Sequence, residues 1–346
     1  MMTLKKYFLF LTILASAKIF ADYSPGLLVN QTLIHDNQLR YYDLYVPSSY
    51  DGSSSYPIVV DIHGFASNKT QQRYLSGFDV LSEQEDFIVA YPLGLHGEPS
   101  NPEGQNPPLG EMPHGPSFNA GGFCCGAALI NETDDVGFIR AMVEAVNAKG
   151  NIDTTRAYVT GLSNGGFMSH RLACEAPDLF AAAAPFAAPI MQDLALDCSQ
   201  QPIPVLTFQG LTDLRTSYEG GLFLKSAQES FEDWSQYNGC TSQIPDLNES
   251  IGANAYCETY NSCENNASVG LCSVTGVPLL NGHILYRNTD DIDLALRAWR
   301  FLEQHQLLSN TPPESSVPIH YSWTVWLLII FSAISYKIRK LKSRNL

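Results

Sequence analysis

The fold is decided by residues 159–166, VTGLSNGG, in which Ser163 lies between a glycine two positions before it and another two positions after it. The residues just before it, 156–160, form a short apolar run that predicts a buried strand, and residues 167–173 have the apolar spacing of a helix. Glycine carries no Cβ, so a chain with glycine at both positions can turn sharply from strand into helix. The stretch therefore predicts a strand–turn–helix unit with the Ser163 hydroxyl exposed at the turn.

G-x-S-x-G is the nucleophile elbow of the α/β-hydrolases, and its serine needs a histidine to take its proton and a carboxylate to orient that histidine. His170 is nearest in sequence, but it lies about 10 Å further along the same helix and points away from the turn. His63 follows an early strand, where this fold builds an oxyanion hole. His283, on a loop just before a closing helix, is the predicted base.

The acid of such a triad comes between the serine and the histidine in chain order and follows a strand. Asp213 fits, because it comes shortly after the apolar run 204–208. A turn or helix-capping aspartate is the alternative interpretation of this residue. Asp134 and Asp135 precede the serine and open a helix, where carboxylates are favourable, so they are interpreted as structural.

The coarse pattern alternates strands with helices, which predicts an α/β fold with a mostly parallel sheet covered by helices on both faces. Two segments, 92–122 and 239–282, break this rhythm and are interpreted as long functional loops. The predicted strands are 39–46, 56–62, 87–90, 156–160 and 204–208, and the predicted helices include 135–148 and 291–306.

Both ends of the chain have the composition of targeting segments. In residues 1–21, Lys5 and Lys6 precede an apolar run, which predicts a signal peptide, with an uncleaved anchor as the alternative. Residues 311–320 are a Pro/Ser linker, 321–336 are a predicted transmembrane helix, and 337–346 are a basic cytoplasmic tail. A cleaved sorting signal is the alternative for this tail. The catalytic domain is then predicted to span residues 22–310.

The predicted domain is strongly acidic. Of 20 lysines and arginines, three lie in residues 1–18 and five in 337–346, whereas all 35 acidic residues lie between these segments, so the part between them has a formal net charge of −23. Such a charge repels nucleic acid and anionic lipid, and no basic patch offsets it. Nucleic acid is therefore excluded as a partner.

Eight cysteines in a chain predicted to be exported indicate disulfides. Cys257 and Cys263 do not have zinc-ligand spacing and no histidine pair accompanies them, so no metal site is predicted. We expect two bridges within the group Cys240, Cys257, Cys263 and Cys272, because short loops close most readily. We expect Cys124, Cys125, Cys174 and Cys198 to form the rest, with adjacent Cys124 and Cys125 taking different partners.

Several linked motifs occur along the chain: YPLG at 91–94, FNAG at 118–121, CCG at 124–126, DDVGF at 134–138, GLSNGG at 161–166, YEGG at 218–221 and GH at 282–283. Together they resemble the secreted polyhydroxybutyrate depolymerase and feruloyl esterase family of α/β-hydrolases. The resemblance implies a triad of Ser163, Asp213 and His283, with the backbone amides of Phe65 and Asn164 as oxyanion donors. Chemistry of this kind requires no metal or organic cofactor.

Two departures from that family pattern flank the predicted triad. Gln209-Gly210 stands where the family tends to have His-Gly, and His283 is followed by Ile-Leu-Tyr rather than by a Trp-Pro pair. These changes bear on the substrate rather than on the reaction. The predicted function is hydrolysis of carboxylic esters through an acyl-enzyme, with a membrane as the partner of the C-terminal helix. The alternatives are a serine peptidase and a non-catalytic surface binding module on the same fold.

Overall fold

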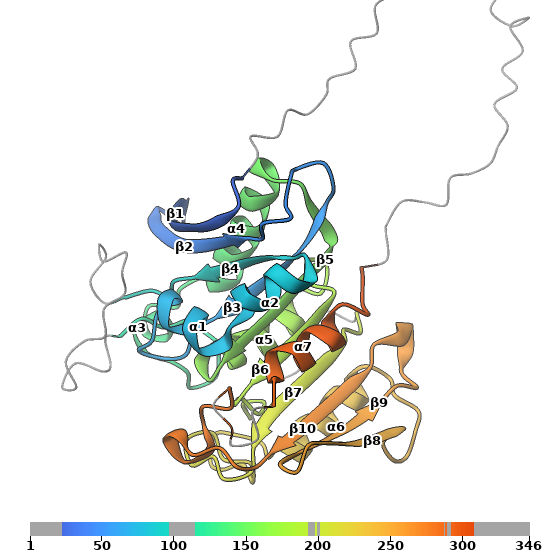
Figure 1. Cartoon of the computed structure of the whole chain (residues 1–346). Helices are drawn as coiled ribbons and strands as arrows, with labels where there is room; N and C mark the ends of the chain where they lie inside the picture. The colour runs from blue at the N-terminus through green and yellow to red at the C-terminus, as the bar shows by residue number, and fades with distance from the viewer. Residues whose placement is uncertain are drawn as a thin grey trace, which may run out of the picture. The chain divides into compact units, whose positions relative to one another are not determined.

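A ten-stranded sheet forms the centre of the protein, as a computed structural model shows in Figure 1. The structure describes residues 23–96, 115–192, 198, 201–286, 288 and 292–307. The strand order is β1-β2-β4-β3-β5-β6-β7-β10-β9-β8. The strands are β1 (Gly26–His35), β2 (Gln38–Val46), β3 (Tyr56–Ile62), β4 (Ile88–Pro92), β5 (Ile152–Leu162), β6 (Ala182–Phe186), β7 (Val205–Gly210), β8 (Leu247–Ile251), β9 (Ala255–Tyr260) and β10 (Val269–Val274).

The middle of the sheet, from β4 to β10 in spatial order, is parallel, and the strands at both edges are antiparallel. Side chains of a strand alternate between the two faces of a sheet. Each face of the sheet accordingly has its own apolar core. One core contains Ile58, Val60 and Ile62 of β3, and the other contains Val59. Both faces of this strand are therefore buried, as the continuous apolar runs of the sequence predict.

Helices cover both faces, which confirms the predicted architecture (Figure 1). One core contains apolar side chains of α4, α5 and α6, and the other contains those of α2 and α7. The described helices are α1 (Lys69–Ser76), α2 (Phe78–Glu85), α3 (Gly126–Ile130), α4 (Asp135–Lys149), α5 (Asn164–Glu175), α6 (Ala227–Tyr237) and α7 (Leu294–Leu302), with 3₁₀ turns η2 (Glu264–Asn266) and η3 (Leu279–Gly282).

The segment 239–282 is not the irregular loop that its composition predicts. It contains β8, β9 and β10, and β10 pairs in parallel with β7 while β9 and β8 extend the sheet in antiparallel register. β8, at the edge of the sheet, and its neighbour β9 carry several polar and partly exposed side chains, which hid the alternation. β10 is buried throughout and is a further strand that the sequence did not predict. The other predicted loop, 92–122, contains residues 97–114, which lie outside the described residues.

The disulfides confirm part of the predicted pairing and correct the rest. Cys240–Cys263 and Cys257–Cys272 lie within the expected group. Cys174 pairs with Cys198, however, and adjacent Cys124 and Cys125 pair with each other, so the expectation of different partners for them is wrong. Cys174 is buried on α5 with its Cα 4.5 Å from that of Cys198, and this proximity leaves the adjacent pair only each other.

The predicted signal peptide at 1–21, the linker at 311–320, the transmembrane helix at 321–336 and the basic tail at 337–346 lie outside the described residues. Among the helices that the structure describes, none has the length and apolar character needed to cross a membrane.

Candidate active site

Ser163 occupies a sharp turn between β5 and α5. Its backbone has φ 57° and ψ −117°, an uncommon conformation for a residue with a Cβ. A Cβ at Gly165 would lie 2.0 Å from the carbonyl oxygen of Ile62, and one at Gly161 would lie 2.6 Å from the same atom. Glycine is therefore required on both sides of the serine because the turn packs directly against the end of β3. The predicted strand–turn–helix unit is present.

His283 and Asp213 meet although they are 70 residues apart in sequence. His283 Nδ1 lies 2.7 Å from Asp213 Oδ2, and both residues are buried. Because a carboxylate only accepts hydrogen bonds, the imidazole proton lies on Nδ1 and Nε2 is the basic nitrogen. Ser163, Asp213 and His283 follow β5, β7 and β10, whose carboxyl ends share one edge of the parallel sheet. This edge is where ligands bind in open α/β sheets.

Asp213 is held by a turn that supplies several hydrogen-bond donors. Its Oδ1 accepts the backbone N–H groups of Arg215 and Thr216 at 2.8 and 3.0 Å. The Thr216 hydroxyl lies 2.7 Å from Oδ2, and Gln209 Nε2 lies 3.4 Å from it. Burial alone would raise the pKa of Asp213, but His283 and the donors of Thr216 outweigh it and lower this pKa. The carboxyl is therefore ionised at neutral pH and can orient His283.

The His283 loop approaches Asp213 closely because Gly282 has no side chain. Gly282 has φ +96°, and a Cβ there would lie 2.6 Å from Thr212 Oγ1 and 2.7 Å from the backbone nitrogen of Asp213. The glycine before the histidine therefore fits a close contact between two loops, as well as a conformation that L side chains rarely adopt. This contact places His283 beside its carboxylate.

Two amides at the same sheet edge are the expected oxyanion donors. Asn164 is the first residue of α5, so its N–H is one of those that a helix leaves without an intrahelical acceptor. Its side chain exchanges hydrogen bonds with the backbone of Phe118, at 2.8 and 2.9 Å, which fixes the start of the helix. Phe65 follows β3, in the turn after Gly64, and a Cβ on Gly64 would lie 3.5 Å from Ser163 Cβ.

The turn that carries Phe65 is fixed by a histidine. His63 Nε2 accepts the N–H of Gly94 at 2.9 Å, so Nδ1 carries the proton and donates to the carbonyl of Gly64 at 2.7 Å. Burial lowers the pKa of His63 to about 4, and the ring is neutral at physiological pH. His63 therefore fixes the turn that carries Phe65, and both of its ring nitrogens are occupied.

His170, which is not the predicted base, is buried on α5. The N–H of Trp234 donates to His170 Nδ1 at 3.0 Å, so Nε2 carries the proton and donates to the carbonyl of Ala188 at 2.8 Å. Burial lowers the pKa of His170 to about 4. Both ring nitrogens are used inside the core, and the residue is structural.

Comparisons with known proteins agree with this geometry. Residues 128–209 match the model of the prolyl oligopeptidase family. The chain is 30% identical over 242 residues to feruloyl esterase B of Piromyces equi, covering 66% of this chain and 40% of the relative. It is 35% identical over 144 residues to poly(3-hydroxyalkanoate) depolymerase C of Paucimonas lemoignei, covering 41% of this chain and 30% of the relative.

The chain is thus similar to feruloyl esterases and to a poly(3-hydroxyalkanoate) depolymerase, and it has an α/β-hydrolase-like fold. The resemblance inferred from its motifs is thereby confirmed. The solved structure of acetyl xylan esterase from Aspergillus awamori matches it with a TM-score of 0.50 and 19% identity, over 73% of this chain and 93% of that chain, which shows the shared fold. The chain spans less than half the length of these two curated relatives.

Two residues that support the site, Thr216 and Phe186, belong to no sequence motif. The hydroxyl of Thr216 donates a hydrogen bond to Asp213. The carbonyl of Phe186 accepts the N–H of Ser163 at 2.9 Å. Asp135 was correctly interpreted as structural, but its role extends beyond the helix start. It is buried, pairs with Arg40 at 2.6 Å and accepts the N–H of Asn119 at 2.7 Å.

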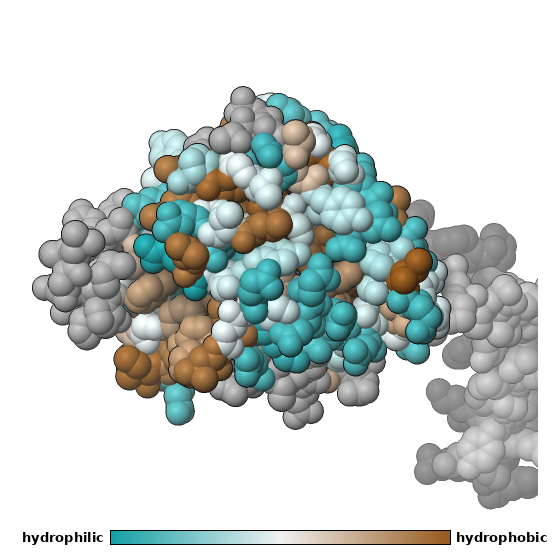
Figure 2. All heavy atoms as spheres, turned by 90° about the horizontal axis from the view of Figure 1, so that it is seen from below, coloured by the Kyte–Doolittle hydropathy of each residue, from teal (hydrophilic) through white to brown (hydrophobic). Residues whose placement is uncertain are grey.

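Exposed apolar side chains surround this edge of the hydrolase. Leu211 and Leu214 flank Asp213, and Leu279 and Leu280 precede His283. Figure 2, which views the molecule from below Figure 1, shows brown groups among the teal ones on this face. The ring of Phe123 packs against Phe167 and Phe223, with ring centroids 6.3 and 5.1 Å apart.

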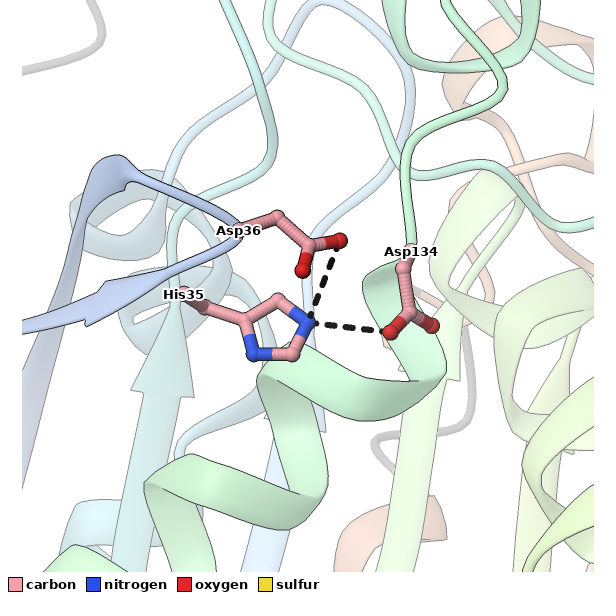
Figure 3. A group of neighbouring side chains, drawn as sticks. All are labelled: His35, Asp36 and Asp134. Atoms are coloured by element: carbon pink, nitrogen blue, oxygen red, sulfur yellow. Dashed lines mark hydrogen bonds and ion pairs between the residues drawn. The ribbon is translucent and has the colours of Figure 1, made fainter.

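A separate cluster, His35, Asp36 and Asp134, has side chains that could hold a metal ion (Figure 3). His35 Nε2 lies 3.0 Å from Asp134 and 3.8 Å from Asp36. Asp134 also caps α4, since its Oδ1 accepts the N–H of Gly137 at 2.9 Å. We interpret the cluster as a link between the β1–β2 hairpin and α4, because His35 of the hairpin already contacts Asp134 at the start of α4.

Proposed function

We propose that this protein hydrolyses carboxylic esters through an acyl-enzyme formed on Ser163. The observation that carries the proposal is the 2.7 Å contact between His283 Nδ1 and Asp213, at the sheet edge where Ser163 occupies its strained turn. Ser163, Asp213 and His283 follow one another along the chain as nucleophile, acid and base, which is the order found in α/β-hydrolases. The relatives support the ester bond in particular, since their names are feruloyl esterase, acetylxylan esterase and poly(3-hydroxyalkanoate) depolymerase.

In the proposed reaction, His283 Nε2 takes the proton of the Ser163 hydroxyl while Ser163 Oγ attacks the ester carbonyl carbon. The carbonyl oxygen becomes an oxyanion and accepts the N–H groups of Phe65 and Asn164, each such donor contributing about 3 kcal/mol. The tetrahedral intermediate expels the alcohol, which takes the proton from His283. Water then gives a proton to His283 and attacks the acyl carbon, releasing the acid and restoring Ser163.

Asp213 stabilises the imidazolium that forms on His283 and stays ionised throughout. The low pKa of Asp213 supports this role, because a carboxyl that ionises readily remains a hydrogen-bond acceptor when His283 becomes charged. The reaction needs no metal or organic cofactor, since the protein groups supply nucleophile, base and electrostatic stabilisation.

A serine peptidase is the second candidate, and the match to the prolyl oligopeptidase family model favours it. That match covers residues 128–209, which contain the nucleophile turn but neither Asp213 nor His283. Nucleophile turns of this kind serve several acyl-transfer reactions, so the match supports the serine chemistry more than it supports a peptide substrate.

We also propose that the enzyme is exported, with its catalytic domain anchored to a membrane by residues 321–336. Four disulfides support an oxidising compartment. The composition of residues 1–21 and 311–346 supports a signal peptide and an anchor with a basic stop. The mass of the mature protein, recovered from membranes, tests this proposal against a tail that is removed after export.

A fluorophosphonate probe tests the proposed activity directly, because only an activated serine reacts quickly. We expect rapid labelling of the full chain at Ser163, no labelling of Ser163→Ala, and turnover of model feruloyl, acetyl and hydroxyalkanoate esters. Peptide substrates included in the same panel distinguish the two candidates. Rapid labelling with peptide turnover alone would favour the peptidase, and absence of labelling would indicate a non-catalytic binding module.

A further inference from the structure

Tyr286 lies three residues after His283, in a segment with little regular structure. The preceding turn, η3, contains left-handed residues at Leu280 and Asn281 and ends at Gly282. Such a segment has few hydrogen bonds of its own, so the position of His283 depends on side chains that attach the segment to the sheet. Leu285 and Tyr286 both join the apolar core on the α7 side of the sheet.

The ring of Tyr286 packs on the ring of Phe186, with centroids 4.6 Å apart and an angle of 32° between the planes. Phe186 is the last residue of β6, and its ring also stacks on Phe208 of β7 at 4.3 Å. Its carbonyl oxygen accepts the N–H of Ser163 at 2.9 Å. Phe186 therefore contacts the nucleophile turn through its backbone and the His283 segment through its ring.

The hydroxyl end of Tyr286 points into the protein rather than to solvent. Its oxygen is buried and has no hydrogen bond of good geometry among the described residues. Burial, together with the nearby Asp61 carboxyl, raises the pKa of Tyr286 well above its usual value, while Thr160 and Gln72 oppose this rise. Asp61 is itself occupied, because Gln72 and Ser76 donate to its two oxygens at 2.7 and 2.6 Å. The ring of Tyr286 therefore makes the specific contact, with Phe186, whereas its hydroxyl makes no hydrogen bond of good geometry.

We propose that Tyr286 is a positioning residue that holds His283 in register with Ser163 through the shared support of Phe186. The inference rests on the proposed function, since it concerns the base and nucleophile of that site. Residues 284–286, Ile-Leu-Tyr, are where this chain departs from the Trp-Pro pair of the family it resembles. Tyr286 is therefore the aromatic anchor that this particular chain uses for its histidine segment.

The test compares Tyr286→Leu, which removes the ring, with Tyr286→Phe, which keeps it. Tyr260→Leu is the matched control, because Tyr260 is also half-buried and stacks on Phe231 at 4.9 Å, on β9 and α6 rather than on the segments of the triad. We expect Tyr286→Leu to lower kcat on a model ester by 10- to 100-fold with little change in KM, since small displacements of catalytic groups have effects of this size. The rate of fluorophosphonate labelling should fall by a similar factor.

Tyr286→Phe and Tyr260→Leu should stay within about threefold of the wild type. Unchanged kcat in Tyr286→Leu would overturn the inference, and so would an equal loss in Tyr260→Leu, because a general loss of stability would then explain it. An equal loss in Tyr286→Phe would also overturn it, because the hydroxyl rather than the ring would be the support.

The downfield proton resonance of His283 Nδ1 gives a readout that does not need turnover. This proton lies in the hydrogen bond to Asp213, and we expect its resonance in the wild type and in Tyr286→Phe but not in Tyr286→Leu. A wild type that neither labels nor turns over esters would refute the proposed function. The resonance would still test the inference, and its persistence in Tyr286→Leu would overturn it.

Discussion

The nucleophile turn at 159–166 and the histidine segment at 279–286 bring two halves of one site together by different means. The turn is partly fixed by its own backbone, because a Cβ at Gly161 would lie 2.7 Å from the carbonyl carbon of Gly165, and both glycines also face the carbonyl of Ile62 on β3. The histidine segment has only a 3₁₀ turn and depends on contacts with distant residues, namely Asp213, Thr212 and Phe186. A side chain of the proposed site can therefore be placed mainly by its neighbours in sequence or mainly by its neighbours in space, and the first leaves the longer motif.

The largest expected effect comes from the turn. Ser163→Ala should lower ester turnover by at least about 10³-fold, since removal of a triad member costs several orders of magnitude. The protein should still fold, because the serine is half-buried and its side-chain oxygen supports no core contact among the described residues. Ester turnover and thermal unfolding of the variant check both statements. Retention of more than about a hundredth of wild-type activity would refute the role of Ser163.

The second prediction compares two buried histidines. His283→Ala should lower turnover by about 10³- to 10⁴-fold, because no other group can take the proton of Ser163. His170→Ala should mainly reduce stability, since its ring nitrogens bind Trp234 and Ala188 inside the core. Measuring kcat per folded molecule separates the two effects. An equal loss of kcat in folded His170→Ala would make the choice of His283 wrong.

The third prediction tests how far the histidine segment depends on its close approach to Asp213. Gly282→Ala should lower kcat by about 10- to 100-fold, because its Cβ would collide with Thr212 and with the backbone of Asp213. Gly221→Ala is the control, since a Cβ there meets no atom within 4 Å. If both variants had wild-type kcat, the segment would be more adaptable than the contacts indicate.

The smallest expected effect concerns Asp61, the buried carboxyl near Tyr286. Burial raises the pKa of Asp61 to about 7, although hydrogen bonds from Ser76 and Gln72 oppose this rise. The folded protein therefore keeps a proton on Asp61 that the unfolded protein releases above about pH 4. Between about pH 4 and 7, rising pH therefore reduces the contribution of Asp61 to stability. The stability of Asp61→Asn relative to wild type should increase through this window, by at most about 1.4 kcal/mol per pH unit, and level off above pH 7.

Urea unfolding of both proteins at a series of pH values measures this difference. Other titrating groups are shared by the two chains and cancel to first order in the comparison. A constant difference between pH 5 and 7 would contradict a protonated Asp61 in the folded protein.

The sequence was sufficient for the order of the main elements and for the identity of the residues that meet. The spacing of apolar residues predicted β3, β7 and α4, and chain order selected Asp213 and His283, which the structure brings within 2.7 Å. It failed for β8, at the edge of the sheet, and for its neighbour β9, whose polar and partly exposed side chains resemble a loop, and it also failed for β10 in the same segment. It also failed for Cys124 and Cys125, because the partner of a cysteine depends on which segments the fold brings together.

The sequence by itself predicted the strand–turn–helix unit at Ser163, because the glycines that permit a sharp turn lie two positions before and two positions after the serine. Only the tertiary structure decided what supports the base. Phe186, Thr216 and Tyr286 are ordinary residues in the sequence, and they acquire roles because parallel β5, β6, β7 and β10 end at one edge of the sheet. Contacts across strands depend on strand order and register, which the residues of one strand do not specify alone.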